Sequence, residues 1–79
     1  PPIIVTGDGS EPLFQIGAVF TDTGGNTYTI TERELTGMKW DYFADLHNPT
    51  TGVRFFHVSI RESQFQDLLS EGATVAGNQ

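Results

Sequence analysis

Residues 39–60 read KWDYFADLHNPTTGVRFFHVSI, a stretch that contains the only tryptophan and both histidines of the chain. Two runs rich in aromatic and β-branched residues flank the turn sequence NPTTG at residues 48–52. Such runs on either side of a Pro/Gly turn are typical of a β-hairpin. Pairing His47 with Val53 leaves a five-residue loop, which is a common hairpin length. We therefore predict two antiparallel strands in this register.

This register sorts the side chains of the hairpin onto two faces, because side chains alternate in direction with period two along a strand. The first face is almost wholly apolar and is predicted to lie in the core. Its cross-strand pairs are Trp40–Ile60, Tyr42–Val58, Ala44–Phe56 and Leu46–Arg54. We expect Trp40 to be largely buried.

The second face mixes apolar side chains with polar ones, although the exposed face of a half-buried hairpin is normally polar. Clustered apolar side chains on such a face indicate that another surface covers them. The cover is expected to be the N-terminal segment, a second copy of the chain or a partner protein. The six candidate interface residues are Phe43, Asp45, His47, Val53, Phe55 and His57.

A length of 79 residues is typical of a single domain. The chain has no cysteine, which excludes an internal disulfide and a thiolate-bound metal. Its formal net charge of −6 disfavours nucleic acid and anionic membrane as partners, since both attract clustered basic residues. No apolar run approaches the roughly 20 residues of a membrane span. The acidic balance favours solubility and permits a basic protein partner.

The N-terminal half predicts a first hairpin. Residues 13–22 (LFQIGAVFTD) alternate between two faces, and Gly17 indicates a bend or bulge within them. A Thr-Gly-Gly turn leads into a return strand at residues 26–31. The outer face of this hairpin is rich in threonine, as expected of a solvated sheet. The predicted pairs are Phe20–Tyr28 and Ala18–Ile30.

One short helix is predicted near residues 60–71. The sequences S-x-x-E and S-x-x-Q, which begin at Ser59 and Ser63, are typical of a helix N-terminus. Gly72 lies where a glycine would end the helix. An apolar stripe with helical spacing lies between these signals and consists of Phe65, Leu68 and Leu69.

The remaining segments complete an all-β fold. Residues 32–38 are predicted to be a connector with Leu35 in the core, and residues 73–76 to be a short last strand. Two bent hairpins, a closing strand and one short C-terminal helix predict a five-stranded antiparallel barrel. The expected limits are an extended N-terminal arm at residues 1–12, a single domain at residues 13–76 and a frayed tail at residues 77–79.

No group of residues predicts catalysis or metal binding. In the predicted register, His47 and His57 are anchored roughly 13 Å apart, which is too far to share one ion. Asp41 and Asp45 lie a similar distance apart, so they do not form a catalytic carboxylate pair. The glycine-rich segments are not followed by helices, as a phosphate-binding loop would be. We therefore expect no catalytic residue, no metal and no cofactor, and nothing in the sequence favours a small-molecule ligand.

A succession of turns and apolar positions runs through FQIGAVFTDTGGNTYTIT (residues 14–31) and WDYFADLHNPTTGVRFFHVSIRESQFQDLL (residues 40–69). It comprises a glycine entry into the first strand, an Asp-then-glycine turn, an Asn-x-x-x-Gly turn and a serine-capped short helix. This pattern resembles small SH3-like barrel proteins, many of which are encoded by phages and other mobile elements. The resemblance implies an SH3-like barrel and an accessory role.

The sequence favours a non-catalytic protein-interaction or assembly module that docks through the outer face of the 39–60 hairpin. One alternative is an oligomeric small-ligand binder or enzyme, whose site would lie between subunits around Phe43, Phe55 and His57. Another is an acidic inhibitor of a basic, nucleic-acid-binding protein surface. The expected partner is a protein or a further copy of the chain. The expected location is the cytoplasm, or the virion if the protein is viral.

Overall fold

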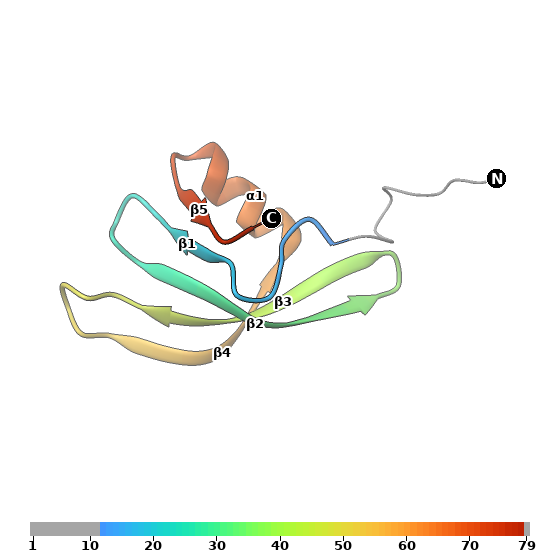
Figure 1. The fold of residues 1–79 in the computed structure, drawn as a ribbon, viewed down its shortest axis with the longest axis horizontal. Coiled ribbons are helices and arrows are strands. Elements are labelled where there is room, and N and C mark those ends of the chain that lie inside the picture. The colour runs from blue at the N-terminus through green and yellow to red at the C-terminus, as the bar shows by residue number, and fades with distance from the viewer. Residues whose placement is uncertain (1–11, 79) are drawn as a thin grey trace.

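The computed structural model describes residues 12–78, which form one antiparallel sheet and one helix (Figure 1). The elements in chain order are β1 (Val19–Thr21), β2 (Thr27–Thr36), β3 (Lys39–His47), β4 (Arg54–Arg61), α1 (Glu62–Ser70) and β5 (Thr74–Ala76). The strand order is β4-β3-β2-β1-β5, with antiparallel neighbours throughout. The prediction of an all-β fold with five antiparallel strands and one short helix is confirmed. Apart from Pro12, the predicted arm lies outside the described residues.

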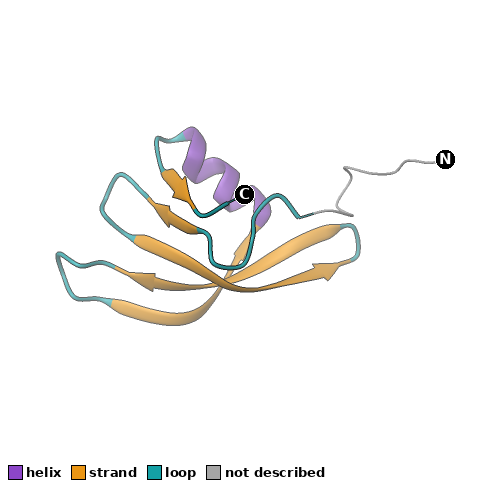
Figure 2. Ribbon diagram, viewed as in Figure 1, coloured by secondary structure: helices purple, strands orange, loops and turns teal. Residues whose placement is uncertain are grey.

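The sheet has a long part and a short part. The long part consists of β2, β3 and β4, and the short strands β1 and β5 continue the sheet beyond β2. Figures 1 and 2 show β1, β5 and α1 together on one side of the long β2–β3–β4 ribbon. The other face of that ribbon is directed away from them, and no helix or strand within residues 12–78 lies over it.

The core is an aromatic cluster that α1 completes. Phe65 of α1 is fully buried and stacks on Phe20 of β1, with 4.3 Å between ring centroids. Phe14, Tyr42 and Tyr28 meet the same ring edge-on, at centroid distances of 5.6, 5.7 and 6.3 Å. Offset-stacked and edge-to-face contacts of this kind add to the stabilisation from burial alone. Rings from four separate segments of the chain thus close around one helical side chain.

Tyr42 connects the sheet, the helix and the chain before β1. Its hydroxyl donates a hydrogen bond to Glu62 Oε2 (2.6 Å) and accepts one from the Phe14 backbone N–H (3.3 Å). The Leu13 backbone N–H donates to the same Glu62 oxygen (3.1 Å). Burial raises the pKa of the Tyr42 hydroxyl, and the hydrogen bond to the Glu62 carboxylate raises it further. The polar end of the buried ring is therefore satisfied within the fold.

The turn between β3 and β4 corrects the predicted register. His47 pairs with Arg54, not with Val53. The Asn48 backbone N–H donates to the Val53 carbonyl O (2.9 Å), and the Gly52 N–H donates to the Asn48 carbonyl O (2.8 Å). The loop between the paired strands is therefore residues 48–53, one residue longer than predicted, and the whole register shifts by one residue at the turn.

A β-bulge in β4 shifts the register by one more residue. Asp45 is opposed by both Phe56 and His57, and Ala44 pairs with Val58 beyond them. The predicted core pair Ala44–Phe56 is therefore wrong, and the Phe56 side chain is 66% exposed. Along the rest of the hairpin the pairs become Tyr42–Ile60 and Leu46–Phe55.

The connector predicted at residues 32–38 is largely strand. β2 extends to Thr36, and its pairing with β3 continues through Thr36 after a bulge between Ile30 and Glu32. Leu35, which was expected in the core, is 46% exposed. Trp40 lies opposite Leu35 and is half-buried, packed against the core and not within it.

The first hairpin is shorter than predicted but has the predicted register. Regular β1 covers three residues, because the chain bends at Gly17 (φ +95°) and turns Phe14 into the core. Asn78, in the predicted frayed tail, accepts a hydrogen bond from the Gln15 N–H (2.9 Å) and donates one to the Leu13 carbonyl O (3.2 Å). The confirmed pairs are Phe20–Tyr28 and, through the hydrogen bond from the Ile30 N–H to the Ala18 carbonyl O (2.9 Å), Ala18–Ile30.

The helix begins two residues later than predicted and has a different cap. Arg61 is the residue before the first turn, and its backbone N–H donates to Gln64 Oε1 (2.8 Å). Ser59, one of the two predicted caps, lies in β4, and Ser63 lies within the first helical turn. At the other end the chain leaves the helix through Gly72 at φ +110°, as predicted.

We expect Phe65→Ala to lower the free energy of unfolding by about 3–5 kcal/mol, because it removes the ring at the centre of the aromatic cluster. Phe56→Ala is a matched control that removes the same side chain from an exposed position, and its effect should stay within about 0.5 kcal/mol. Urea unfolding followed by circular dichroism measures both. Equal losses in the two variants would contradict the central position of Phe65.

The turn between β1 and β2 is held by one carboxylate. Asp22 Oδ1 accepts hydrogen bonds from the backbone N–H groups of Gly24 (2.9 Å) and Asn26 (3.0 Å). Its Oδ2 accepts from the Asn26 side-chain amide and from the Tyr28 hydroxyl, both at 3.0 Å. Partial burial raises the pKa of Asp22, but these hydrogen bonds outweigh it and lower the pKa below its ordinary value of 3.8.

Because the pKa of Asp22 is lower in the folded chain than in the unfolded one, its ionisation stabilises the fold. That stabilisation is complete above the ordinary pKa and is lost as the pH falls through the lowered one. We expect Asp22→Asn to lower the free energy of unfolding by about 1 kcal/mol at neutral pH, after allowance for solvent competition. Urea titrations of both proteins at a series of pH values should show the difference shrinking below about pH 4. A difference that persists unchanged at low pH would assign the effect to shape and not to charge.

Candidate functional site

The outer face of the sheet is the face of β2, β3 and β4 that is directed away from α1. Residues directly opposite one another in an antiparallel pair share a face, so the register places Glu32 beside Phe43 and Glu34 beside Asp41. Asp45 shares this face, because it alternates with the buried Ala44. We define the outer face by Glu32, Glu34, Asp41, Phe43, Asp45 and His57.

The bulge at Thr31 puts Glu32 on the outer face. An unbroken register from the start of β2 would place Glu32 opposite Tyr42, on the core face. The extra residue instead places Glu32 opposite Phe43. The Thr31 hydroxyl donates to the Phe43 carbonyl O (3.2 Å) across the bulge.

The bulge in β4 does the same for His57. An unbroken register from the turn would place His57 opposite Ala44, on the core face. Because Phe56 and His57 together oppose Asp45, the His57 ring lies on the outer face and stacks on Phe43. The two rings are nearly parallel, at 5°, and their centroids are 4.4 Å apart.

His57 holds this position in a strained backbone conformation. Its φ of +56° makes it the only non-glycine residue with positive φ in the described part of the chain. The left-handed region costs a residue with a Cβ about 1–2 kcal/mol. The His57 side chain is 60% exposed, so burial does little to offset this cost.

Two carboxylates hold the histidine. The His57 backbone N–H donates to Asp45 Oδ1 (3.2 Å), which fixes the bulge. Glu32 Oε1 lies 3.7 Å from His57 Nδ1, and this is the only ion pair within residues 12–78. Since both side chains of that pair are mostly exposed, it adds little to the stability of the fold.

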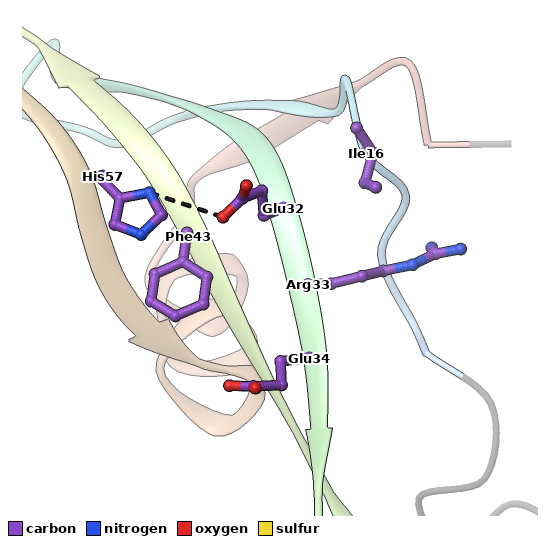
Figure 3. Close-up of a pocket in the computed structure, with 6 residues that line it drawn as sticks. All are labelled: Ile16, Glu32, Arg33, Glu34, Phe43 and His57. Atoms are coloured by element: carbon purple, nitrogen blue, oxygen red, sulfur yellow. Dashed lines mark ion pairs between the residues drawn. The ribbon is translucent and has the colours of Figure 1, made fainter.

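A shallow groove of about 490 Å³ lies over part of the outer face and reaches across β2 to Ile16 and Arg33. Figure 3 shows Glu32 and Glu34 extending from β2 to the side on which the two rings lie, whereas Arg33 extends to the other side of the strand. The Arg33 guanidinium donates to the Phe14 carbonyl O (3.0 Å) and lies 5.8 Å from the centre of the Trp40 ring. The residues that line the groove are Ile16, Glu32, Arg33, Glu34, Phe43 and His57.

The structure brings together three of the six candidate interface residues, namely Phe43, Asp45 and His57. His47 lies at the end of β3 nearest the turn, opposite Arg54. Val53 lies in that turn, and the register turns Phe55 towards the other face of the sheet, opposite Leu46. The one-residue shift at the turn therefore removes Phe55 from the group. That the remaining residues form an interface stays a prediction.

Glu32 and Glu34 were missing from the predicted group. Both lie in the part of β2 for which the sequence predicts a connector. The alternation E-x-E-x-T at residues 32–36 was a signal for a strand with one acidic face. It was hidden by the bulge at Thr31, which changes the phase of the alternation in mid-strand.

Other kinds of site find less support in the described part of the chain. No three histidine, aspartate or glutamate side chains within residues 12–78 are grouped closely enough to hold a metal ion. In the same residues, no helix has the length and apolar character needed to cross a membrane. Comparisons with family models, with curated proteins and with solved structures found no match.

The strain at His57 can be measured by comparing two substitutions that both remove the ring. We expect His57→Gly to be more stable than His57→Ala by about 1 kcal/mol, because only glycine adopts positive φ without a steric cost. Thermal and urea unfolding of both variants give this difference. Equal stabilities would mean that the bulge relaxes when the ring is absent, and that the histidine backbone is not strained.

Proposed function

We propose that the protein is a non-catalytic interaction or assembly module that docks a protein partner through the outer face. The observation that carries this proposal is the arrangement of two bulges and one left-handed residue around Phe43. They direct His57 and Glu32 to an exposed face, where neither contributes much to the core. Strain retained at an exposed position is characteristic of functional sites.

The chemistry of the face agrees with a protein partner. Aromatic side chains are enriched at the centres of protein interfaces, where they supply large contact areas with little loss of side-chain entropy. The Phe43–His57 stack is already fixed in one geometry by the bulge and by Asp45. A partner would therefore meet a pre-organised surface, which lowers the entropic cost of association.

The order of the strands supports the resemblance to SH3-like barrels, and an accessory role is what that resemblance implies. β1 to β4 follow one another as a meander, and β5 returns to pair with β1 after α1. We propose that this connectivity is that of an SH3-like barrel, and that the protein serves a phage or another mobile element. Its place of action would be the cytoplasm or the virion.

A second candidate function is a homo-oligomer with a ligand-binding or active site between subunits. β4 is an edge strand of the described sheet, and edge strands carry unpaired backbone groups that can pair with another chain. Three exposed apolar side chains lie in or beside it, namely Val53, Phe55 and Phe56. Light scattering after size exclusion separates the two candidates, because a strict monomer has no site between subunits.

The third candidate, an acidic inhibitor of a basic surface, uses the same outer face. Its carboxylates are those of Glu32, Glu34, Asp41 and Asp45. Such an inhibitor would bind its target mainly through charge, and the affinity would fall steeply with salt. Docking through the Phe43–His57 stack predicts a weaker salt dependence.

The main proposal is tested by selecting binders from a displayed library of random peptides. We expect the selected peptides to shift the backbone amide NMR signals of β2, β3 and β4 on the outer face. We also expect Phe43→Ser to weaken their binding at least about 10-fold, since a central aromatic residue is worth more than 1.4 kcal/mol.

Met38→Ser is the matched control, because Met38 is an apolar side chain exposed at the turn between β2 and β3. Both variants should keep the melting temperature of the parent within a few degrees. Peptides that map to another surface, or that bind Phe43→Ser as tightly as the parent, would refute the proposed docking face.

A further inference from the structure

We infer that the groove on the outer face binds an arginine side chain of the protein partner, an inference that rests on the proposed function. The groove is lined by the rings of Phe43 and His57, which stack on each other, and by the carboxylates of Glu32 and Glu34. A planar cation fits both parts at once, because it can lie against a ring while its edge donates hydrogen bonds to a carboxylate.

The charge of the groove is unbalanced in the direction that a cation requires. Glu34 has no ion-pair partner within residues 12–78, and the only partner of Glu32 is the exposed His57. The single basic side chain of the lining, Arg33, is directed away to the Phe14 carbonyl O and the Trp40 ring. Within these residues Glu34 is therefore available to an incoming cation, and Glu32 can share its carboxylate between the cation and His57.

The shape of the groove favours a side chain over a free small molecule. Sites for small ligands normally enclose most of the ligand surface. This groove lies open across the sheet, and both His57 and Glu32 in its lining are mostly exposed. An arginine presented by a folded or extended partner needs only the rings and the carboxylates, since the rest of the partner supplies the remaining contacts.

Arginine fits the geometry better than lysine. The guanidinium group is planar and presents a fork of donors that matches a carboxylate, and it stacks on aromatic rings more often than an ammonium does. Glu32 and Glu34 extend from alternate positions of β2 to the side of that strand on which the two rings lie. A guanidinium beside the Phe43–His57 stack can therefore meet one carboxylate without leaving the rings.

The test uses the peptides selected from the random displayed library and measures their affinities for the intact chain. We expect the peptides that map to the outer face to be enriched in arginine. Replacing that arginine by citrulline keeps the planar shape but removes the charge, and it should weaken binding about 10-fold. Replacing it by lysine should weaken binding about 3-fold, because the charge remains and the fork is lost.

The protein side of the test is Glu34→Gln, which removes one charge from the groove and is expected to weaken the arginine peptides about 3-fold. Asp67→Asn is the matched control, because it removes one charge from an exposed position of α1. Its effect on the same peptides should be negligible. The citrulline exchange leaves the protein unchanged, so it holds even if a variant is destabilised.

Each outcome bears on one of the two proposals. Peptides that map to the outer face without arginine, or that bind equally well with citrulline, overturn the arginine site and leave the docking face standing. Equal affinity of the lysine peptides overturns the choice of arginine. Peptides that map elsewhere overturn the docking face itself, and the arginine site with it.

Discussion

The insertion of Phe65 into the aromatic cluster is the contact on which the rest of the structure depends. A single ring from α1 meets rings from the segment before β1, from β1, from β2 and from β3. The sheet bends around the helix to bring these rings together, so all strong burial is concentrated on one side of the ribbon. The opposite side of β2, β3 and β4 therefore carries none of the buried core residues.

The sequence predicted the fold wherever a strand keeps one phase of alternation. The pair Phe20–Tyr28, the stripe around Phe65 and the exit at Gly72 all follow from local periodicity or from glycine, and all are confirmed. The errors lie where an extra residue changes the phase. Nothing near Thr31 or His57 indicates a bulge in the sequence. Glycine within a strand is the usual sequence signal of a bulge, and neither of these residues is a glycine.

The residues of the candidate site were likewise predicted correctly where the alternation is unbroken and incorrectly where an extra residue changes its phase. Phe43 and Asp45 were placed correctly because β3 itself has no bulge, and every position on it alternates as expected. Phe55 was misplaced because the length of the turn, and not the strand, sets its face. The bulge at His57 depends on a hydrogen bond from its backbone N–H to the carboxylate of Asp45, 12 residues away. A contact between residues so far apart in sequence is invisible to local patterns.

The two bulges face the same short segment of β3 from opposite sides, and this placement separates the site from the core. In each neighbour of β3, one extra residue moves a polar side chain, Glu32 or His57, from the core face to the outer face. On the core side of the same strands, Ile30 and Ile60 remain buried, so the register of the core tolerates both insertions. Side chains on the outer face can therefore change without repacking the cluster around Phe65. A small domain with one core can in this way keep a stable fold and a variable binding surface on the two faces of one sheet.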